Sequence, residues 1–131
     1  MIFKVPAIEV SDFWGSHIRP FLKENDYYTI SSIHISLMTG AKDVWLVVSA
    51  EEPQAVMIAD FRMVGGHNVY SIFYLGGKDM NSWIDELSDA VISHCKSKEV
   101  RRIQALVRDG LVRKLLERGW DKINTMVELK L

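Results

Sequence analysis

Three apolar runs joined by short turns constrain the fold of this chain more than any other feature. The runs cover residues 44–50 (VWLVVSA), 55–64 (AVMIADFRMV) and 69–75 (VYSIFYL), and they are rich in β-branched and aromatic residues. The connecting segments contain Pro53 and the Gly65-Gly66 pair, which are typical of turns. Because strands joined by such short turns run antiparallel, the sequence predicts a meander of three antiparallel strands.

Helical spacing follows the third run. Gly76 and Gly77 interrupt the apolar pattern, and a long helix is predicted from Ser82, with Asp85 as its partner in a capping box. The predicted core face of this helix carries apolar residues three or four positions apart: Trp83, Ile84, Leu87 and Val91.

A strand, a helix and a closing strand complete the pattern. Residues 102–107 (RIQALV) form a short apolar run, and the next helix is predicted to begin at Asp109 and to end at Gly119. In residues 124–131 every second side chain lies on one side of an extended chain, which predicts a closing strand. The residues on that side are Thr125, Val127, Leu129 and Leu131.

The first 40 residues are predicted to be helical. Ser11 precedes an amphipathic segment that Pro20 bends or shortens, and Asp26 begins a break. The segment that starts at Thr29 fits both the alternation of a strand and a helix face with Thr29 as the cap. The helix is favoured.

The composition is that of one domain. The chain has 131 residues, of which 48% are hydrophobic, so it can bury a core without disulfides or metal. We expect one α+β domain over residues 1–131, with a helical N-terminal part (1–40) and a sheet and crossover-helix core (44–131). The 16 basic and 17 acidic residues leave a net charge of −1, which argues against a nucleic-acid site.

The single cysteine and the absence of long apolar runs bear on the compartment. Cys95 has no partner for a disulfide, and the four histidines show no ligand spacing, so no metal site is expected. No run approaches the ~18 apolar residues of a membrane span, and the first residues carry no secretion signal. We therefore expect a cytoplasmic protein that is neither secreted nor bound to a membrane.

Three segments carry a resemblance to a known family. They are residues 74–83 (YLGGKDMNSW), 102–110 (RIQALVRDG) and 112–120 (VRKLLERGW), in the predicted order β-β-β-α-β-α-β from residue 44. Together they resemble the Gcn5-related N-acetyltransferase (GNAT) superfamily. The resemblance implies a mixed central sheet flanked by helices, in which an antiparallel meander is joined by a parallel strand that splays away. The resulting cleft would be bordered by Tyr74, Leu75, Val107 and Arg108.

The pattern looks most similar to uncharacterised GNAT-like proteins of tailed bacteriophages and prophages. The matching features are the Val44-Trp45 pair, Gly77 with Trp83 six residues beyond, and Arg108 and Gly110 before the Gly119-Trp120 pair. Leu111 departs from that pattern, in which an aromatic residue follows Gly110. This resemblance implies that the protein is located in the cytoplasm of a bacterial host or in the virion. It also implies other phage proteins as partners.

The resemblance also implies where a cofactor would bind. GNAT enzymes hold the pyrophosphate of CoA with backbone N–H groups at the start of the long helix, where the helix dipole favours phosphates. Gly76, Gly77, Lys78 and Asn81 are the candidate cofactor-binding residues here. Their spacing differs from the family motif and Asp79 adds a negative charge, so a tight strand-to-helix turn is favoured and acetyl-CoA is not expected to bind.

The usual catalytic residues of the family have no counterparts. Leu115 stands in place of the tyrosine that serves as general acid, and residues 69–75 contain no carboxylate to serve as base. The remaining catalytic candidates are Asp60, His67 and Tyr74, and Asp60 is also interpreted as a residue of a solvated strand face.

Two hypotheses follow. The favoured one is a phage-type GNAT-like protein with a structural, assembly or interaction role. The alternative is an N-acetyltransferase that uses acetyl-CoA through a divergent loop.

Overall fold

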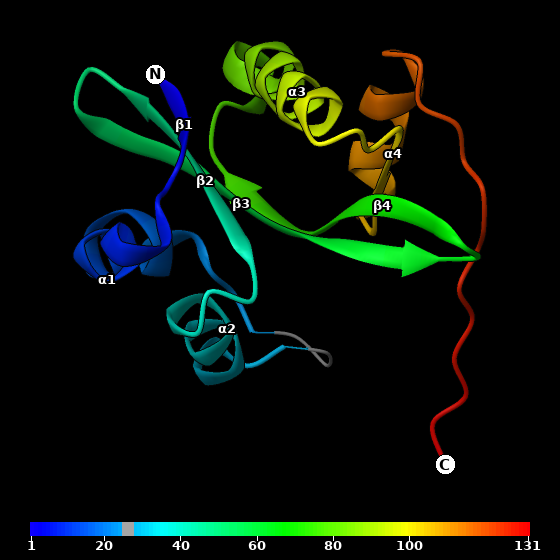
Figure 1. Cartoon of the computed structure of the whole chain (residues 1–131), viewed down its shortest axis with the longest axis horizontal. Helices are drawn as coiled ribbons and strands as arrows, with labels where there is room; N and C mark the ends of the chain where they lie inside the picture. The colour runs from blue at the N-terminus through cyan, green and yellow to red at the C-terminus, as the bar shows by residue number, and fades with distance from the viewer. Residues whose placement is uncertain (25–27) are drawn as a thin grey trace.

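The computed structural model describes residues 1–24 and 28–131, so the break predicted at Asp26 lies outside the described residues. It is an α+β fold in which a five-stranded sheet has the order β1-β2-β3-β4-β5 and helices cover both faces (Figure 1). The strands are β1 (Ile2–Lys4), β2 (Asp43–Ser49), β3 (Glu52–Val64), β4 (His67–Gly77) and β5 (Arg102–Ala105). The α-helices are α1 (Val10–Phe13), α2 (Ile30–Met38), α3 (Met80–Ser97) and α4 (Asp109–Leu116).

The predicted meander is confirmed, but its first turn is shifted. β2, β3 and β4 are antiparallel neighbours, and β5 joins β4 in parallel. The first turn consists of Ala50 and Glu51, both with positive φ (49° and 64°), so that β3 already begins at Glu52. Two-residue turns with two positive φ angles match the twist of a hairpin, and Pro53 is accommodated next to a register shift in the ladder. The second turn, at Gly65 and Gly66, is of the same kind.

The N-terminal part is not wholly helical. β1 pairs antiparallel with β2, with Ile2 opposite Val47. Three residues are too few to display an alternation, so only the pairing reveals this strand.

The helical turns that follow β1 begin at Ala7, so Ser11 lies inside them and does not cap them. They pass through a π-helical turn (Trp14–Ile18) and a 3-10 turn (Arg19–Phe21), and Pro20 stands in the first positions of the latter. A proline is tolerated there because its missing N–H would have no helical acceptor.

The helix predicted after Thr29 is confirmed. The Thr29 hydroxyl accepts a hydrogen bond from the Ser32 amide (3.1 Å), and the Ser32 hydroxyl accepts one from the Thr29 amide (3.2 Å). This reciprocal cap fixes the start of α2, and Gly40 follows its end with a φ of 74°. Together with α1, α2 packs on one face of the sheet.

α3 covers the other face of the sheet. It buries Trp83, Ile84, Leu87, Val91 and Cys95, which confirms the predicted apolar face. The predicted capping box of Ser82 and Asp85 does not form. Instead α3 begins two residues earlier, after Asp79 in a left-handed conformation (φ 55°), and the Ser82 hydroxyl donates to the Asp79 carbonyl (2.6 Å).

The predicted closing strand is wrong. α4 ends before Gly119, which has a φ of 90°, and the residues after Trp120 run away from the domain as an extended segment (Figure 1). β5 is also shorter than predicted and ends at Ala105. Alternation gives an extended segment an apolar side, but a strand forms only where another strand supplies its hydrogen bonds.

The burial of Trp83 generates a stability prediction. Its side chain is 4% exposed and its indole N–H donates to the Lys78 carbonyl (2.7 Å). We expect Trp83→Ala to lower the free energy of unfolding by about 3–5 kcal/mol in urea titrations, because it leaves a cavity under α3. The control Glu86→Ala, on the exposed side of the same helix, should stay within about 0.5 kcal/mol of the parent. A melting temperature of Trp83→Ala close to that of the parent would contradict this core assignment.

Candidate functional site

β4 and β5 separate from each other close to the start of α3. Their parallel pairing covers only residues 69–72 of β4, and the Leu106 amide makes the last contact, with the Ile72 carbonyl (3.3 Å). Beyond that point β4 continues to Gly77 paired with β3 alone. The splay that the resemblance implied is therefore present.

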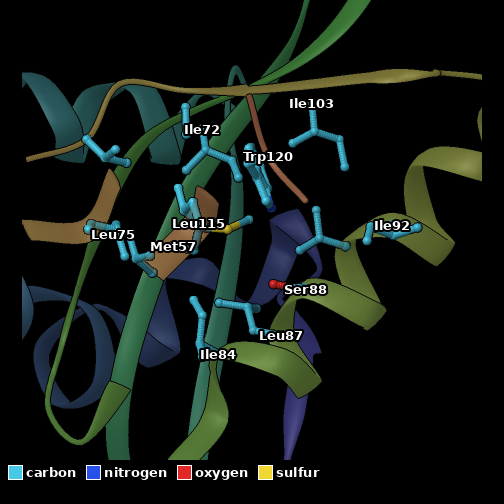
Figure 2. Close-up of a pocket in the computed structure, with 14 residues that line it drawn as sticks. Met57, Ile72, Leu75, Ile84, Leu87, Ser88, Ile92, Ile103, Leu115 and Trp120 are labelled. Atoms are coloured by element: carbon cyan, nitrogen blue, oxygen red, sulfur yellow. The ribbon is translucent and has the colours of Figure 1, made fainter. Parts of the chain in front are cut away.

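An apolar hollow opens where the two strands separate. Figure 2 shows side chains from β3, β4, α3, β5 and α4 pointing into one space, and Ser88 is the polar residue among them. The lining residues are Met57, Ile72, Leu75, Ile84, Leu87, Ser88, Val91, Ile92, Ile103, Ala105, Val107, Leu111, Leu115 and Trp120. Such a lining can hold an apolar group, but it offers almost nothing to orient a polar one.

Two of the four residues expected at the cleft line this hollow, and two do not. Leu75 and Val107 line it. Arg108 lies at the N-cap of α4, outside the lining. Tyr74 is turned to the other face, because the pairing of β3 with β4 shifts between Ile58 and Ala59 and leaves one extra residue in β4.

The Tyr74 phenol connects the sheet to the N-terminal segment by hydrogen bonds. It donates to the Phe21 carbonyl (2.6 Å) and accepts a hydrogen bond from the Lys23 amide (3.0 Å). Both partners belong to the N-terminal segment, so this candidate catalytic hydroxyl holds that segment against the end of β4.

A second, polar hollow lies at the start of α3. It is lined by Ser49, Gln54, Asp79, Met80, Asn81, Ser82 and Lys114. Asn81 is the one candidate cofactor residue that takes part, since Gly76, Gly77 and Lys78 are not in the lining. The first amides of a helix lack intrahelical acceptors and carry partial positive charge, which Lys114 supplements and Asp79 opposes.

The glycine pair is explained by the sheet. Gly76 and Gly77 are strand residues that pair with Val56 and Ala55. A Cβ atom on Gly77 would lie 2.3 Å from the Cβ of Ala55, and one on Gly76 would lie 2.8 Å from the Phe21 carbonyl oxygen. The Lys78 amide donates to the Gln54 carbonyl (3.0 Å), so it continues this close pairing. A tight strand-to-helix turn accounts for these residues without a ligand.

The other two catalytic candidates lie outside both hollows. The Asp60 carboxylate forms ion pairs with Lys42 and with Arg62 (2.8 Å), and its side chain is only 13% exposed. It is thus a half-buried, doubly paired residue and not a residue of a fully solvated face. His67 is exposed at the hairpin turn. Leu115, in the place of the family's general acid, is buried in the apolar hollow.

The sequence did not predict a buried polar cluster, which is formed by Trp45, Tyr70, Asp43 and His94. The indole N–H of Trp45 donates to the hydroxyl of Tyr70 (2.9 Å), which in turn donates to Asp43 (2.8 Å). Nε2 of His94 lies 3.9 Å from the same carboxylate and has no hydrogen-bond partner among the described residues. These residues come from β2, β4 and the end of α3, so no local spacing could have revealed them.

Burial sets the protonation of this cluster. It raises the pKa of the Tyr70 phenol, with a contribution from Asp43, so the hydroxyl remains a donor. It lowers the pKa of His94, against the opposing pull of Asp43. Burial also raises the pKa of the Cys95 thiol to about 11, which makes it an unreactive core residue.

Comparison with solved structures shows which fold the chain has. No protein-family model matches the sequence, and no curated protein matches it. Among solved structures, the chain is similar to a predicted acetyltransferase from Clostridium acetobutylicum with acetyl-CoA, at 11% identity and a TM-score of 0.69, over 99% of this chain and 95% of that chain. It is also similar to an aminoglycoside 6'-N-acetyltransferase from Acinetobacter haemolyticus, at 13% identity and a TM-score of 0.68, over 100% and 97%.

A third similar structure is a ribosomal-protein-alanine N-acetyltransferase from Brucella melitensis biovar Abortus, at 10% identity and a TM-score of 0.69, over 100% of this chain and 99% of that chain. The chain therefore has the fold of the GNAT acetyltransferases, as predicted.

Two further findings concern the described part of the chain. None of the helices in residues 1–24 and 28–131 is long and apolar enough to cross a membrane. The same residues include no group of three or more His, Cys, Asp or Glu side chains that could hold a metal ion.

The lowered pKa of His94 generates a pH prediction. Because the folded pKa lies below the usual value of about 6.5, the unfolded chain binds a proton more readily than the folded chain. The resulting loss of unfolding free energy is absent well above pH 6.5 and grows as the pH falls below this value. We expect His94→Phe to lose part of the decline in unfolding free energy between about pH 7.5 and 5.5, as measured by chemical denaturation.

The matched control for this experiment is His67→Phe, since His67 is exposed. It should keep the decline of the parent protein. Parallel stability curves for the parent and His94→Phe would show that His94 is protonated equally in both states.

Proposed function

We propose that this protein acts through binding, in a structural, assembly or interaction role, and does not transfer acetyl groups. The observation that carries the proposal is that two of the three candidate proton-transfer groups are engaged elsewhere, and that the third, His67, is exposed at the hairpin turn outside both hollows. Asp60 is held by two cations, the Tyr74 hydroxyl donates to the Phe21 carbonyl, and Leu115 occupies the position of the usual acid.

Acetyl transfer needs a base, so the hydrogen bonds and ion pairs of these groups bear directly on whether the reaction can occur. An attacking amine must give up a proton to a base within hydrogen-bond reach, directly or through one water. Neither Asp60 nor Tyr74 lines the apolar or the polar hollow, and the former also has its oxygens occupied by Lys42 and Arg62. Freeing either group would break contacts that hold strands and layers together.

The resemblance to phage GNAT-like proteins supports a setting for this role. It rests on the Val44-Trp45 pair, Gly77 with Trp83, and the residues that lead to Gly119-Trp120. The partners would then be other phage proteins, in the cytoplasm of an infected bacterium or in a virion.

The second candidate function is an acetyl-CoA-dependent N-acetyltransferase with a divergent loop. The polar hollow favours it, because the start of α3 and Lys114 together suit a phosphate group. A similar solved structure also carries acetyl-CoA. Under this alternative the proton would leave through water or to Asp79, the carboxylate in the lining of that hollow.

Calorimetry with acetyl-CoA tests the proposal. We expect no binding in the micromolar range, because Asp79 lies where phosphates would be and Gly77 is fully used by the sheet. A micromolar dissociation constant would contradict the proposal if Lys114→Glu weakens it at least about tenfold, or about 1.4 kcal/mol. The matched control is Arg113→Glu, which makes the same charge change on α4 outside the lining of the hollow.

A further inference from the structure

The hairpin of β3 and β4 reaches beyond both of its neighbouring strands. β2 pairs with β3 only as far as Ala59, and β5 pairs with β4 only from Val69 onward. Residues 60–68 therefore form an arm of two strands, which within the described part of the chain are paired with each other alone. The arm projects from the sheet (Figure 1), and residues 61–68 are all exposed.

Large apolar side chains cover the tip of this arm. Phe61, Met63 and Val64 are 44%, 67% and 44% exposed, next to the turn at Gly65 and Gly66. Successive side chains of a strand point to opposite sides, so Met63 and Val64 make both sides of the tip apolar. A flat protein surface would cover only one of these sides, whereas a lipid layer can surround both.

Basic residues lie on the segment that connects α3 to β5. Residues 96–102 carry four exposed cations against one exposed carboxylate, Glu99. The cations are Lys96, Lys98, Arg101 and Arg102.

Two contacts place this basic segment at the base of the arm. Arg102 is the ladder partner of Val69, the first residue of β4 after the arm. In the last turn of α3, the ring of His94 lies 5.9 Å from the ring of Phe61. The basic residues and the apolar tip thus belong to the same end of the molecule.

The charge of this end differs from that of the rest of the chain. Lys42 is ion-paired with Asp60 of the arm, and together with it the arm and residues 96–102 carry six basic and two acidic residues, a net charge of +4. The whole chain has a net charge of −1, so the remainder carries −5. The field of an anionic surface would orient such a molecule with the arm toward the surface.

We propose that the arm of residues 60–68 docks this protein on an anionic lipid surface, with Phe61, Met63 and Val64 entering the lipid layer and the basic residues of 96–102 facing the lipid phosphates. Phe61 suits the boundary of the layer, because aromatic rings are enriched between the acyl chains and the water. In docking of this kind, the buried apolar area and the attraction to anionic lipids both contribute to binding.

The proposal concerns the surface of a membrane and not its interior. The location away from membranes that the sequence predicts rests on the lack of a spanning segment, and docking by a hairpin requires none. The inference also goes beyond the proposed function, since no residue of the arm lines the apolar or the polar hollow.

Co-sedimentation with vesicles tests the proposal on the full chain. We expect the protein to sediment with an equal mixture of phosphatidylglycerol and phosphatidylcholine, to stay in solution with phosphatidylcholine alone, and to be released by added salt. Met63→Asp/Val64→Asp should lower the partition coefficient at least about tenfold. The control Ile8→Asp/Ile35→Asp adds the same charge at two other exposed apolar positions and should stay within about threefold of the parent.

A second pair of variants tests the basic residues. Arg101→Glu/Arg102→Glu should lower the partition coefficient at least about tenfold, because each basic residue near an anionic surface contributes to binding. The control Arg108→Glu/Arg113→Glu makes the same charge change at the N-cap and in the body of α4, and it should stay within about threefold of the parent. A parent that does not bind the anionic vesicles, or equal losses in a variant and its control, would overturn the proposal.

Fluorescence quenching separates insertion from attraction by charge alone. A fluorophore on Met63→Cys should be quenched by lipids that carry a nitroxide on the acyl chain, whereas one on Ile8→Cys should not, and Cys95 is buried and takes no label. An unquenched label on Met63→Cys would contradict the insertion of the tip. Binding to a DNA duplex that is as strong as binding to the anionic vesicles, and is unchanged in Met63→Asp/Val64→Asp, would identify a nucleic acid as the partner and overturn the proposal.

Discussion

The parallel pairing of β4 with β5 lasts only over residues 69–72, and the arrangement around α3 depends on where it stops. From Val69 to Ile72 the strand β4 has neighbours on both sides, and beyond Ile72 it is paired with β3 alone. The end of this pairing frees the space that Leu75, Ile84 and Leu115 line. It also lets β4 deliver the chain directly into α3, so the apolar and the polar hollow both lie close to the first turns of that helix.

One extra residue in β4 decides which side chains reach the hollow. Tyr70 and Ile72 pack on the side of α3, and regular alternation would have placed Tyr74 beside them. The shift in the ladder turns Tyr74 to the opposite face and brings Leu75 into the hollow. A hydroxyl that regular alternation would place near the splayed strands is thereby used to hold the N-terminal segment.

Local sequence patterns predicted most helices and strands, whereas the features that depend on contacts between residues far apart in the sequence were not predicted. The cap at Thr29 and the apolar face of α3 were readable because each lies within one or two turns of helix. The turn chemistry of residues 51–54 predicts the first turn too late, because Pro53 lies inside β3 and neither Ala50 nor Glu51 is a glycine. In the candidate site, Asn81 was predicted, but Ser49 and Lys114 join it from β2 and α4, which no spacing in the sequence brings together.

The fit of Gly77 against Ala55 has a consequence for how related chains should be compared. Any descendant that keeps β3 and β4 in register must keep a residue without a side chain at this point, whether or not a nucleotide ever binds nearby. The glycine is thus required by the packing of the sheet itself. Its persistence along a lineage would record the spacing of two strands, and an ancestral cofactor could be lost while the glycine stayed.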